Sequence, residues 1–252
     1  GLVGIVAQLL RRRPLAACFV ASWPAWAIGV GGFFGYHLVY FTALRRLPAV
    51  EALLIINLWP LLIVLLSTFA TGERLLPRHL VGAVAGLAGA TLLVLASPPA
   101  TTVPRTGSGY LLAVAAAFIW SGYSVLNRKF AADTPTDAVT GFCLVTGVLG
   151  LLTHALLEPA AEIDATGRLA VLLLGLGPVG LAFYLWDHGT KHGDLRVLGS
   201  AAYAAPLIGT VLLLLMGEGE PSLALALAAA LIVGGAAWAS TAPTRRTPAA
   251  AT

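Results

Sequence analysis

Eight runs of at least 18 residues contain no Lys, Arg, Asp or Glu, and they occupy most of this 252-residue sequence. An apolar α-helix needs about 20 residues to cross roughly 30 Å of hydrocarbon at about 1.5 Å per residue. We therefore predict eight complete transmembrane helices, which fall in the runs Pro14–Leu44, Ala52–Gly72, His79–Pro104, Thr106–Asn127, Ala138–Leu157, Leu169–Trp186, Val197–Gly217 and Pro221–Thr244.

The composition excludes a soluble domain. Only 10% of the residues are charged and 58% are hydrophobic, whereas about a quarter of a typical soluble domain is charged. The net charge of +4 is too small to indicate a nucleic-acid partner, so the lipid bilayer is the expected surrounding. We predict an all-α polytopic membrane protein.

A ninth apolar run, Gly1–Leu10, is too short to span the bilayer and ends at Arg11–Arg13. We interpret it as the end of a helix that begins before residue 1. A signal peptide would carry its charges before the apolar stretch rather than after it.

The charges between the runs predict the topology. If Arg11–Arg13 lie in the cytoplasm and the runs alternate in direction, eleven Lys and Arg residues are cytoplasmic and four lie opposite. This satisfies the positive-inside rule. It places residues 245–252 in a cytoplasmic tail.

Three pairs of similar features recur at a nearly constant distance along the chain. Pro60 and Pro206 are 146 positions apart, Glu73 and Glu218 are 145 apart, and Ser97 and Ser240 are 143 apart. Chance similarity between Ala/Leu-rich helices is the alternative to a true repeat.

We predict two repeats from this spacing. The first covers residues 1–101, with the partial helix 1–10 and three further helices, and the second covers residues 107–244 with five helices. The whole protein is then expected to have ten helices. Because five is odd, the two repeats have opposite orientations, and inverted repeats are typical of secondary transporters.

Three prolines are predicted to break helices, namely Pro60, Pro178 and Pro206. Proline has no N–H and frees the carbonyl four residues earlier. Broken helices within a membrane usually face a cavity, although a tolerated kink in a packed helix is the alternative.

Polar and aromatic side chains within the runs are the candidate substrate-binding residues, since such groups are costly in lipid. If equivalent residues of the two repeats are 148 positions apart, Tyr36 and Tyr40 of the first repeat correspond to positions 184 and 188 of the second. An interfacial or capping role is the alternative for Trp186, Asp187 and His188. The candidates are Tyr36, His37, Tyr40, Asn57, Trp59, Trp120, Tyr123, Tyr184, His188 and Tyr203.

Several short motifs resemble the drug/metabolite transporter superfamily with EamA-type repeats, and within it the aromatic amino acid exporters of the YddG type. The motifs are Asn57-Leu-Trp-Pro60, Phe118-Ile-Trp-x-x-Tyr123, Asn127-Arg-Lys129, Trp186-x-x-Gly-x-x-His-Gly193 and Gly199-Ser-x-x-Tyr-x-x-Pro206. The resemblance implies a multi-pass protein of the bacterial inner membrane with a cytoplasmic C-terminus. It also implies a central cavity lined by Tyr36, His37, Tyr40, Trp59 and Trp120.

The resulting functional hypothesis is export of neutral aromatic amino acids by alternating access. Aromatic walls can stack a phenyl or indole ring. They can also hold a cation, so efflux of lipophilic cationic drugs is the alternative.

The sequence has no HExxH motif or P-loop, and Cys18 and Cys143 are too far apart to suggest a metal site. We therefore predict no enzyme activity, catalytic residue, metal or cofactor. A monomer is expected, with a homodimer as the alternative.

Overall fold

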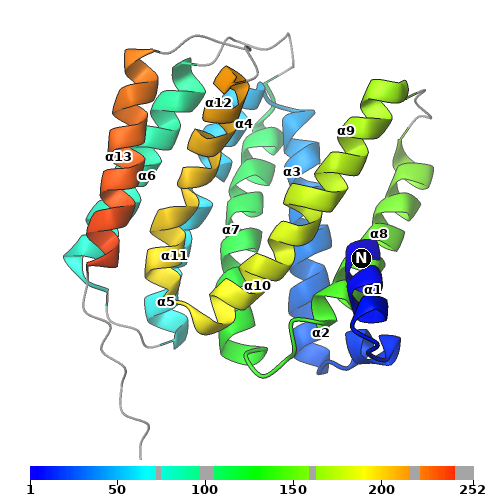
Figure 1. The fold of residues 1–252 in the computed structure, drawn as a ribbon. Helices are drawn as coiled ribbons and strands as arrows, with labels where there is room; N and C mark the ends of the chain where they lie inside the picture. The colour runs from blue at the N-terminus through cyan, green and yellow to red at the C-terminus, as the bar shows by residue number, and fades with distance from the viewer. Residues whose placement is uncertain (72–74, 97–104, 159–162, 216–221, 242–252) are drawn as a thin grey trace, which may run out of the picture.

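In a computed structural model, all of the described secondary structure is helical, and the helices form one bundle (Figure 1). The structure describes residues 1–71, 75–96, 105–158, 163–215 and 222–241. The elements are α1 (Leu2–Leu10), the 3₁₀ helix η1 (Leu15–Phe19), α2 (Trp23–Val30), the π-helical segment η2 (Gly31–Gly35), α3 (Tyr36–Leu44), α4 (Ala49–Ile56), α5 (Trp59–Thr71), α6 (Pro77–Ala96), α7 (Gly107–Phe130), α8 (Ala138–Leu157), α9 (Ala165–Leu176), the π-helical segment η3 (Gly177–Leu181), α10 (Ala182–His192), α11 (Leu195–Ala202), α12 (Ala204–Leu215) and α13 (Leu223–Ser240).

Seven of the eight predicted spans are long and apolar enough in the described residues to cross a membrane. The eighth, predicted at Val197–Gly217, corresponds to α11 and α12, and the apolar helix described there, Leu195–Gly209, is shorter. The first span begins at Trp23 rather than Pro14, because Ser22 caps its N-terminus and η1 forms a separate turn before it. Residues 97–104 of the third predicted run lie outside the described residues.

Successive spans run in alternating directions (Figure 1). The ends of α1, α7 and α10 and the beginnings of α6 and α11 lie at one end of the bundle, at the bottom of Figure 1. We call this the basic end. Its described basic residues are Arg11, Arg12, Arg13, Arg78, Arg128, Lys129, Lys191 and Arg196.

Two of the three predicted proline breaks interrupt the helix outright. The chain leaves helical geometry at Asn57, just before Pro60, and at Tyr203, just before Pro206. Pro178 instead lies in η3, a π-helical turn within a continuous span. Pro60 and Pro206 are tolerated because each lies in the first turn of a helix, α5 or α12, where no N–H donor is needed.

Equivalent elements recur at a spacing of 146 residues. The π-helical segments begin at Gly31 and Gly177, α4 and α11 begin at Ala49 and Leu195, and α6 and α13 begin at Pro77 and Leu223. The offset of 148 that paired Tyr36 and Tyr40 with positions 184 and 188 was therefore wrong by two residues. At 146, the equivalent of Tyr40 is Trp186.

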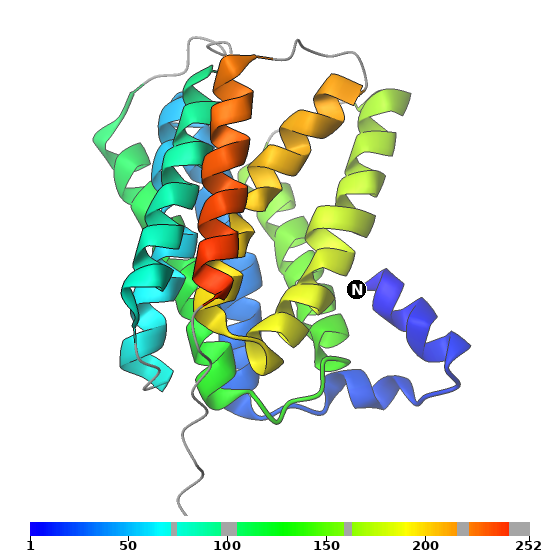
Figure 2. The same ribbon diagram turned by 60° about the vertical axis from the view of Figure 1, so that its left-hand side comes forward.

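Glycines bring α6 and α13 into close contact, and both views show the two helices side by side (Figures 1 and 2). A Cβ on Gly235 would lie 2.8 Å from the carbonyl oxygen of Gly82, and a Cβ on Gly89 would lie 2.9 Å from that of Ala228. Small residues are the usual means of close helix packing in membranes. The α6–α13 pair therefore depends on them.

We expect Gly235→Val to destabilise the protein by about 1–3 kcal/mol, because the added side chain forces the α6 and α13 backbones apart. Gly234 provides a matched control on the same helix, since a Cβ there has no neighbour within 4 Å. Thermal midpoints in detergent measure the difference. Equal midpoints for the 234 and 235 variants would contradict the packing argument.

Candidate functional site

The indole of Trp120 lies at the centre of a group of seven aromatic rings, which we call the aromatic cluster. Trp120 is 8% exposed, and its ring centroid lies 5.1–6.3 Å from those of six other residues. These six come from η2, α3, α5, α7 and α10. They are Phe33, Tyr36, Trp59, Tyr123, Phe183 and Trp186.

Three of the rings around Trp120 are only half-buried. Tyr36, Trp59 and Trp186 are half-buried, whereas Phe33, Tyr123 and Phe183 are buried. Trp59 and Trp186 meet edge to face, with centroids 5.3 Å apart and planes at 81°. The half-buried rings provide apolar faces on which a flat substrate ring can stack.

The π-helical segment η2 positions one side of the cluster. Gly32 allows it to approach α7, because a Cβ there would lie 2.6 Å from the ring of Tyr123. The next residue, Phe33, then stacks on Phe183 with centroids 4.3 Å apart and planes at 19°. π-Helical turns are frequent at functional sites, and this one sets Phe33 of η2 against Phe183 of α10.

Two predicted residues lie beside the cluster on α3. Tyr40 is half-buried and contacts the ring of Tyr36 at 5.5 Å. The ring of His37 contacts Phe183 at 5.8 Å. The Nδ1–H of His37 donates to the Phe33 carbonyl at 2.7 Å, which leaves Nε2 as an acceptor.

The two broken helices meet at their breaks. The hydroxyl of Tyr203 donates to the backbone carbonyl of Asn57 at 3.0 Å, and these residues are 146 positions apart. Tyr203 is 1% exposed and packs against Gly86 of α6. Both predicted residues therefore lie at the helix crossing, where they hold α4–α5 against α11–α12.

Two predicted residues lie outside the cluster. The hydroxyl of Tyr184 is within 3.0 Å of the Thr140 hydroxyl on α8, so this ring faces α8. His188 is exposed and stacks on His192, with ring centroids 4.4 Å apart. The structure does not bring either residue together with Trp120.

A buried polar network, which the sequence analysis missed, lies next to the cluster at the basic end. It comprises Asn127, Thr136, Asp187, Thr190 and Lys191. Nζ of Lys191 lies 2.8 Å from Asp187 Oδ1, and both side chains are 1% exposed. Asn127 and Thr136 donate to the same carboxylate at 3.0 and 2.8 Å. The network joins α7, α10 and the turn before α8.

Trp186 belongs to the aromatic cluster but was not among the predicted substrate-binding residues. Its Nε1–H donates to Ser124 Oγ at 3.0 Å, and Ser124 in turn donates to the carbonyl of Trp120 at 2.8 Å. The available signal was its position 146 residues after Tyr40, which the offset of 148 obscured.

One described pocket, of about 190 Å³, lies between α3 and α8 and includes His37 and Thr146. Among its lining residues, hydrogen bonds from His154 at 2.7 Å and Arg45 at 2.5 Å lower the pKa of the Glu158 carboxyl. The side-chain oxygen of Thr146 is buried with no hydrogen-bond partner. The pocket offers polar groups beside the cluster.

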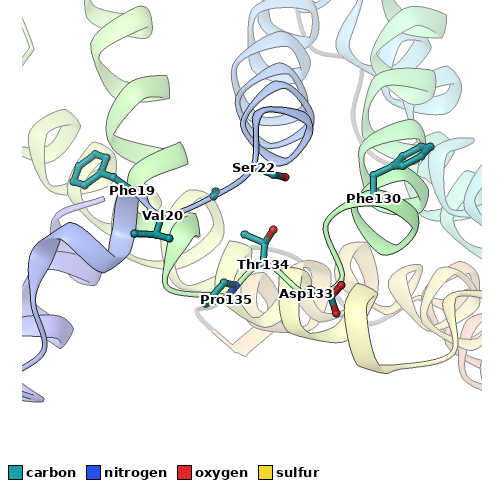
Figure 3. Close-up of a pocket in the computed structure, with 8 residues that line it drawn as sticks. Phe19, Val20, Ser22, Phe130, Asp133, Thr134 and Pro135 are labelled. Carbon is teal, nitrogen blue, oxygen red and sulfur yellow. The ribbon is translucent and has the colours of Figure 1, made fainter.

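A second described pocket, of about 490 Å³, lies at the basic end between the segment before α2 and the α7–α8 turn. Figure 3 shows Ser22 and Thr134 on its opposite sides. The carbonyl of Thr134 accepts a hydrogen bond from Lys191 at 2.8 Å, so this pocket borders the buried polar network.

No group of three or more His, Cys, Asp or Glu side chains could hold a metal ion within the described part of the chain. The absence of a cofactor stays a prediction. Cys18 and Cys143 are both free, and Cys18 is buried.

A family model described as the EamA-like transporter family matches residues 2–95 and 107–241. The aromatic amino acid exporter YddG of Ancylobacter novellus is 52% identical over 241 residues, which are 95% of this chain and 83% of that protein. The YddG of Salmonella typhimurium is 26% identical over 180 residues, or 69% of this chain and 61% of that protein.

A similar fold occurs in a crystal structure of a protein that is 51% identical to this chain. The two structures match with a TM-score of 0.87 over 95% of this chain and 83% of the other.

Proposed function

The chain belongs to the EamA-like transporter family, and from this premise we propose that it exports neutral aromatic amino acids with the aromatic cluster as the substrate site. Members of this family are transporters, which agrees with the prediction that the chain is not an enzyme. Its seven apolar helices and bacterial relatives identify a multi-pass membrane protein. The relatives named aromatic amino acid exporters support the substrate class.

The arrangement around Trp120 is the observation that carries this proposal. Six rings from five elements surround one indole, and three of them keep a partly exposed face. A phenyl or indole side chain can stack there. The Nε2 acceptor of His37 can receive a hydrogen bond from the substrate's ammonium group, and the hydroxyl of Tyr36 can donate to its carboxylate.

The transport mechanism that we propose is alternating access between two inverted repeats, residues 1–101 and 107–244. The family model matches residues 2–95 and 107–241 as separate stretches, and equivalent elements are 146 residues apart. In Figure 1, α2 and α3 rise where α9 and α10 descend. Opposite directions are what an inverted pair requires.

The orientation and assembly state belong to the same proposal. We propose that the protein lies in the bacterial inner membrane. The concentration of Lys and Arg at the basic end supports a cytoplasmic position for that end, and with it a cytoplasmic tail at residues 245–252. A monomer is proposed, because one chain supplies all seven rings of the cluster. The ten-helix total stays a prediction.

The substrate class can be tested with purified protein in liposomes. We expect saturable uptake of radiolabelled phenylalanine that unlabelled tryptophan inhibits and that methyl viologen does not. Transport of methyl viologen alone would favour the efflux of lipophilic cations, which aromatic faces can also bind. Comparison with protein-free liposomes controls for leakage, and flux of neither compound would overturn the proposed substrate class.

A further inference from the structure

Trp186 is fixed in place more firmly than the other half-buried rings of the cluster. Its indole packs against Trp59 at 5.3 Å and Trp120 at 6.2 Å. It also donates a hydrogen bond to Ser124, which is fully buried. The next residue along α10 is Asp187 of the buried polar network. Trp186 therefore lies where the aromatic cluster borders the basic end.

The equivalent residue in the first repeat is Tyr40, which has a different environment. Its ring contacts Tyr36 and Phe41 of α3 at 5.5 and 5.2 Å, and it packs against the core cluster that holds Ala52 of α4 and Ala113 of α7. The same position in the two repeats thus holds an aromatic ring that packs against two tryptophans in one case and against a core of small and aliphatic side chains in the other.

The two ends of the bundle also differ in how buried their ion pairs are. At the basic end, Asp187 and Lys191 bind each other and α7 within a buried network. At the opposite end, α3 and α8 are joined by Arg45 and Glu158, which are partly exposed. The pocket of about 190 Å³ between these helices is also lined by Arg45 and Glu158. Each end carries a pocket, of about 490 Å³ at the basic end and about 190 Å³ at the opposite end. At the basic end the buried polar network joins that pocket, through Thr134, to the helix that carries Trp186.

We propose that Trp186 is the gate residue that closes the substrate site toward the basic end, and that Ser124 is its positioning residue. Tyr40 is its counterpart toward the opposite end. The inference rests on the proposed transport function. When the repeats exchange conformations, Trp186 leaves Trp59 and Trp120, and the site opens toward the pocket that Thr134 lines.

The test measures access to the site from each face of the membrane. Ser124→Cys is made with Cys18 and Cys143 replaced by alanine, and a membrane-impermeant maleimide is added to one face at a time. We expect Trp186→Ala to raise the labelling rate from the basic face about tenfold, because the ring contacts that cover position 124 are lost. Labelling from the opposite face should stay unchanged.

Two control variants accompany Trp186→Ala. Leu185→Ala removes a neighbouring side chain that is 67% exposed, and Tyr40→Ala removes the counterpart ring. Neither should change labelling from the basic face. Equal labelling in the Trp186 and Leu185 variants would overturn the gate, and so would a rise of equal size from both faces.

A second measurement tests the positioning role of Ser124 apart from a folding defect. Ser124→Ala and Trp186→Phe each remove the same hydrogen bond, so the double variant should change the KM for phenylalanine no more than either single variant. Additive changes would overturn the role of Ser124. The labelling result needs no transport and tests the gate even if phenylalanine is not the substrate.

Discussion

Replacing Trp120 by alanine is expected to raise the KM for phenylalanine by about 10- to 100-fold, since it removes the ring that all other members of the cluster contact. Liposome flux over a range of phenylalanine concentrations measures the change. Phe118→Ala is the matched control, because this ring is on the same helix and is 51% exposed. It should leave the KM unchanged.

Loss of the Trp120 ring also weakens the fold, because a buried tryptophan replaced by alanine costs about 3–5 kcal/mol. Trp59→Ala separates the two effects. Trp59 is half-buried, so its loss should raise the KM with a smaller fall in thermal stability. If both variants kept the original KM in folded protein, the aromatic cluster would not be the substrate site.

Breaking the Asp187–Lys191 pair is expected to produce a large loss of stability. Lys191→Met leaves the Asp187 carboxylate buried without its cation, and Asp187→Leu leaves the ammonium group without its anion. Such losses cost about 3–5 kcal/mol, whereas replacing both partners by apolar residues is often nearly neutral. The double variant Asp187→Leu/Lys191→Met should therefore recover most of the stability of the original protein.

Thermal midpoints in detergent distinguish these outcomes. Arg45→Gln is the matched control, since it removes an ion pair whose side chains are 61% and 29% exposed, and solvent screens such pairs. We expect no measurable shift there. A double variant as unstable as either single one would show that Asn127 and Thr136 need the carboxylate as their acceptor.

The helical segments were predictable because their physical cause is local. A charge-free run of sufficient length specifies a span, and Pro60 and Pro206 lie where the chain leaves helical geometry. The π-helical turn in the first span was missed because its own residues, Gly31–Gly35, include no proline. Gly31–Gly35 forms a π-helical turn there, and glycines within an apolar run do not by themselves indicate one.

The faces of the helices were harder to predict than their positions. Tyr184 and His188 follow the π-helical segment η3, whose wider turn rotates the face of α10 relative to α9. An i,i+4 pattern identifies residues that share a face but not the neighbour they meet. Phe33, Phe183 and Trp186 enter the cluster through contacts between distant segments, which no single run of residues reveals.

The hydrogen bond between Tyr203 and Asn57 has a consequence for how this chain can diverge. In an isologous dimer of identical halves, residues at the symmetry axis would pair with their own copies. Here the hydroxyl of Tyr203 is the donor and the acceptor is a backbone carbonyl, which every residue supplies, so only the donor depends on the sequence. Under the proposed repeat, two copies of the first half, with asparagine at both positions, could not rebuild this contact, whereas two copies of the second half keep both the tyrosine donor and a carbonyl acceptor.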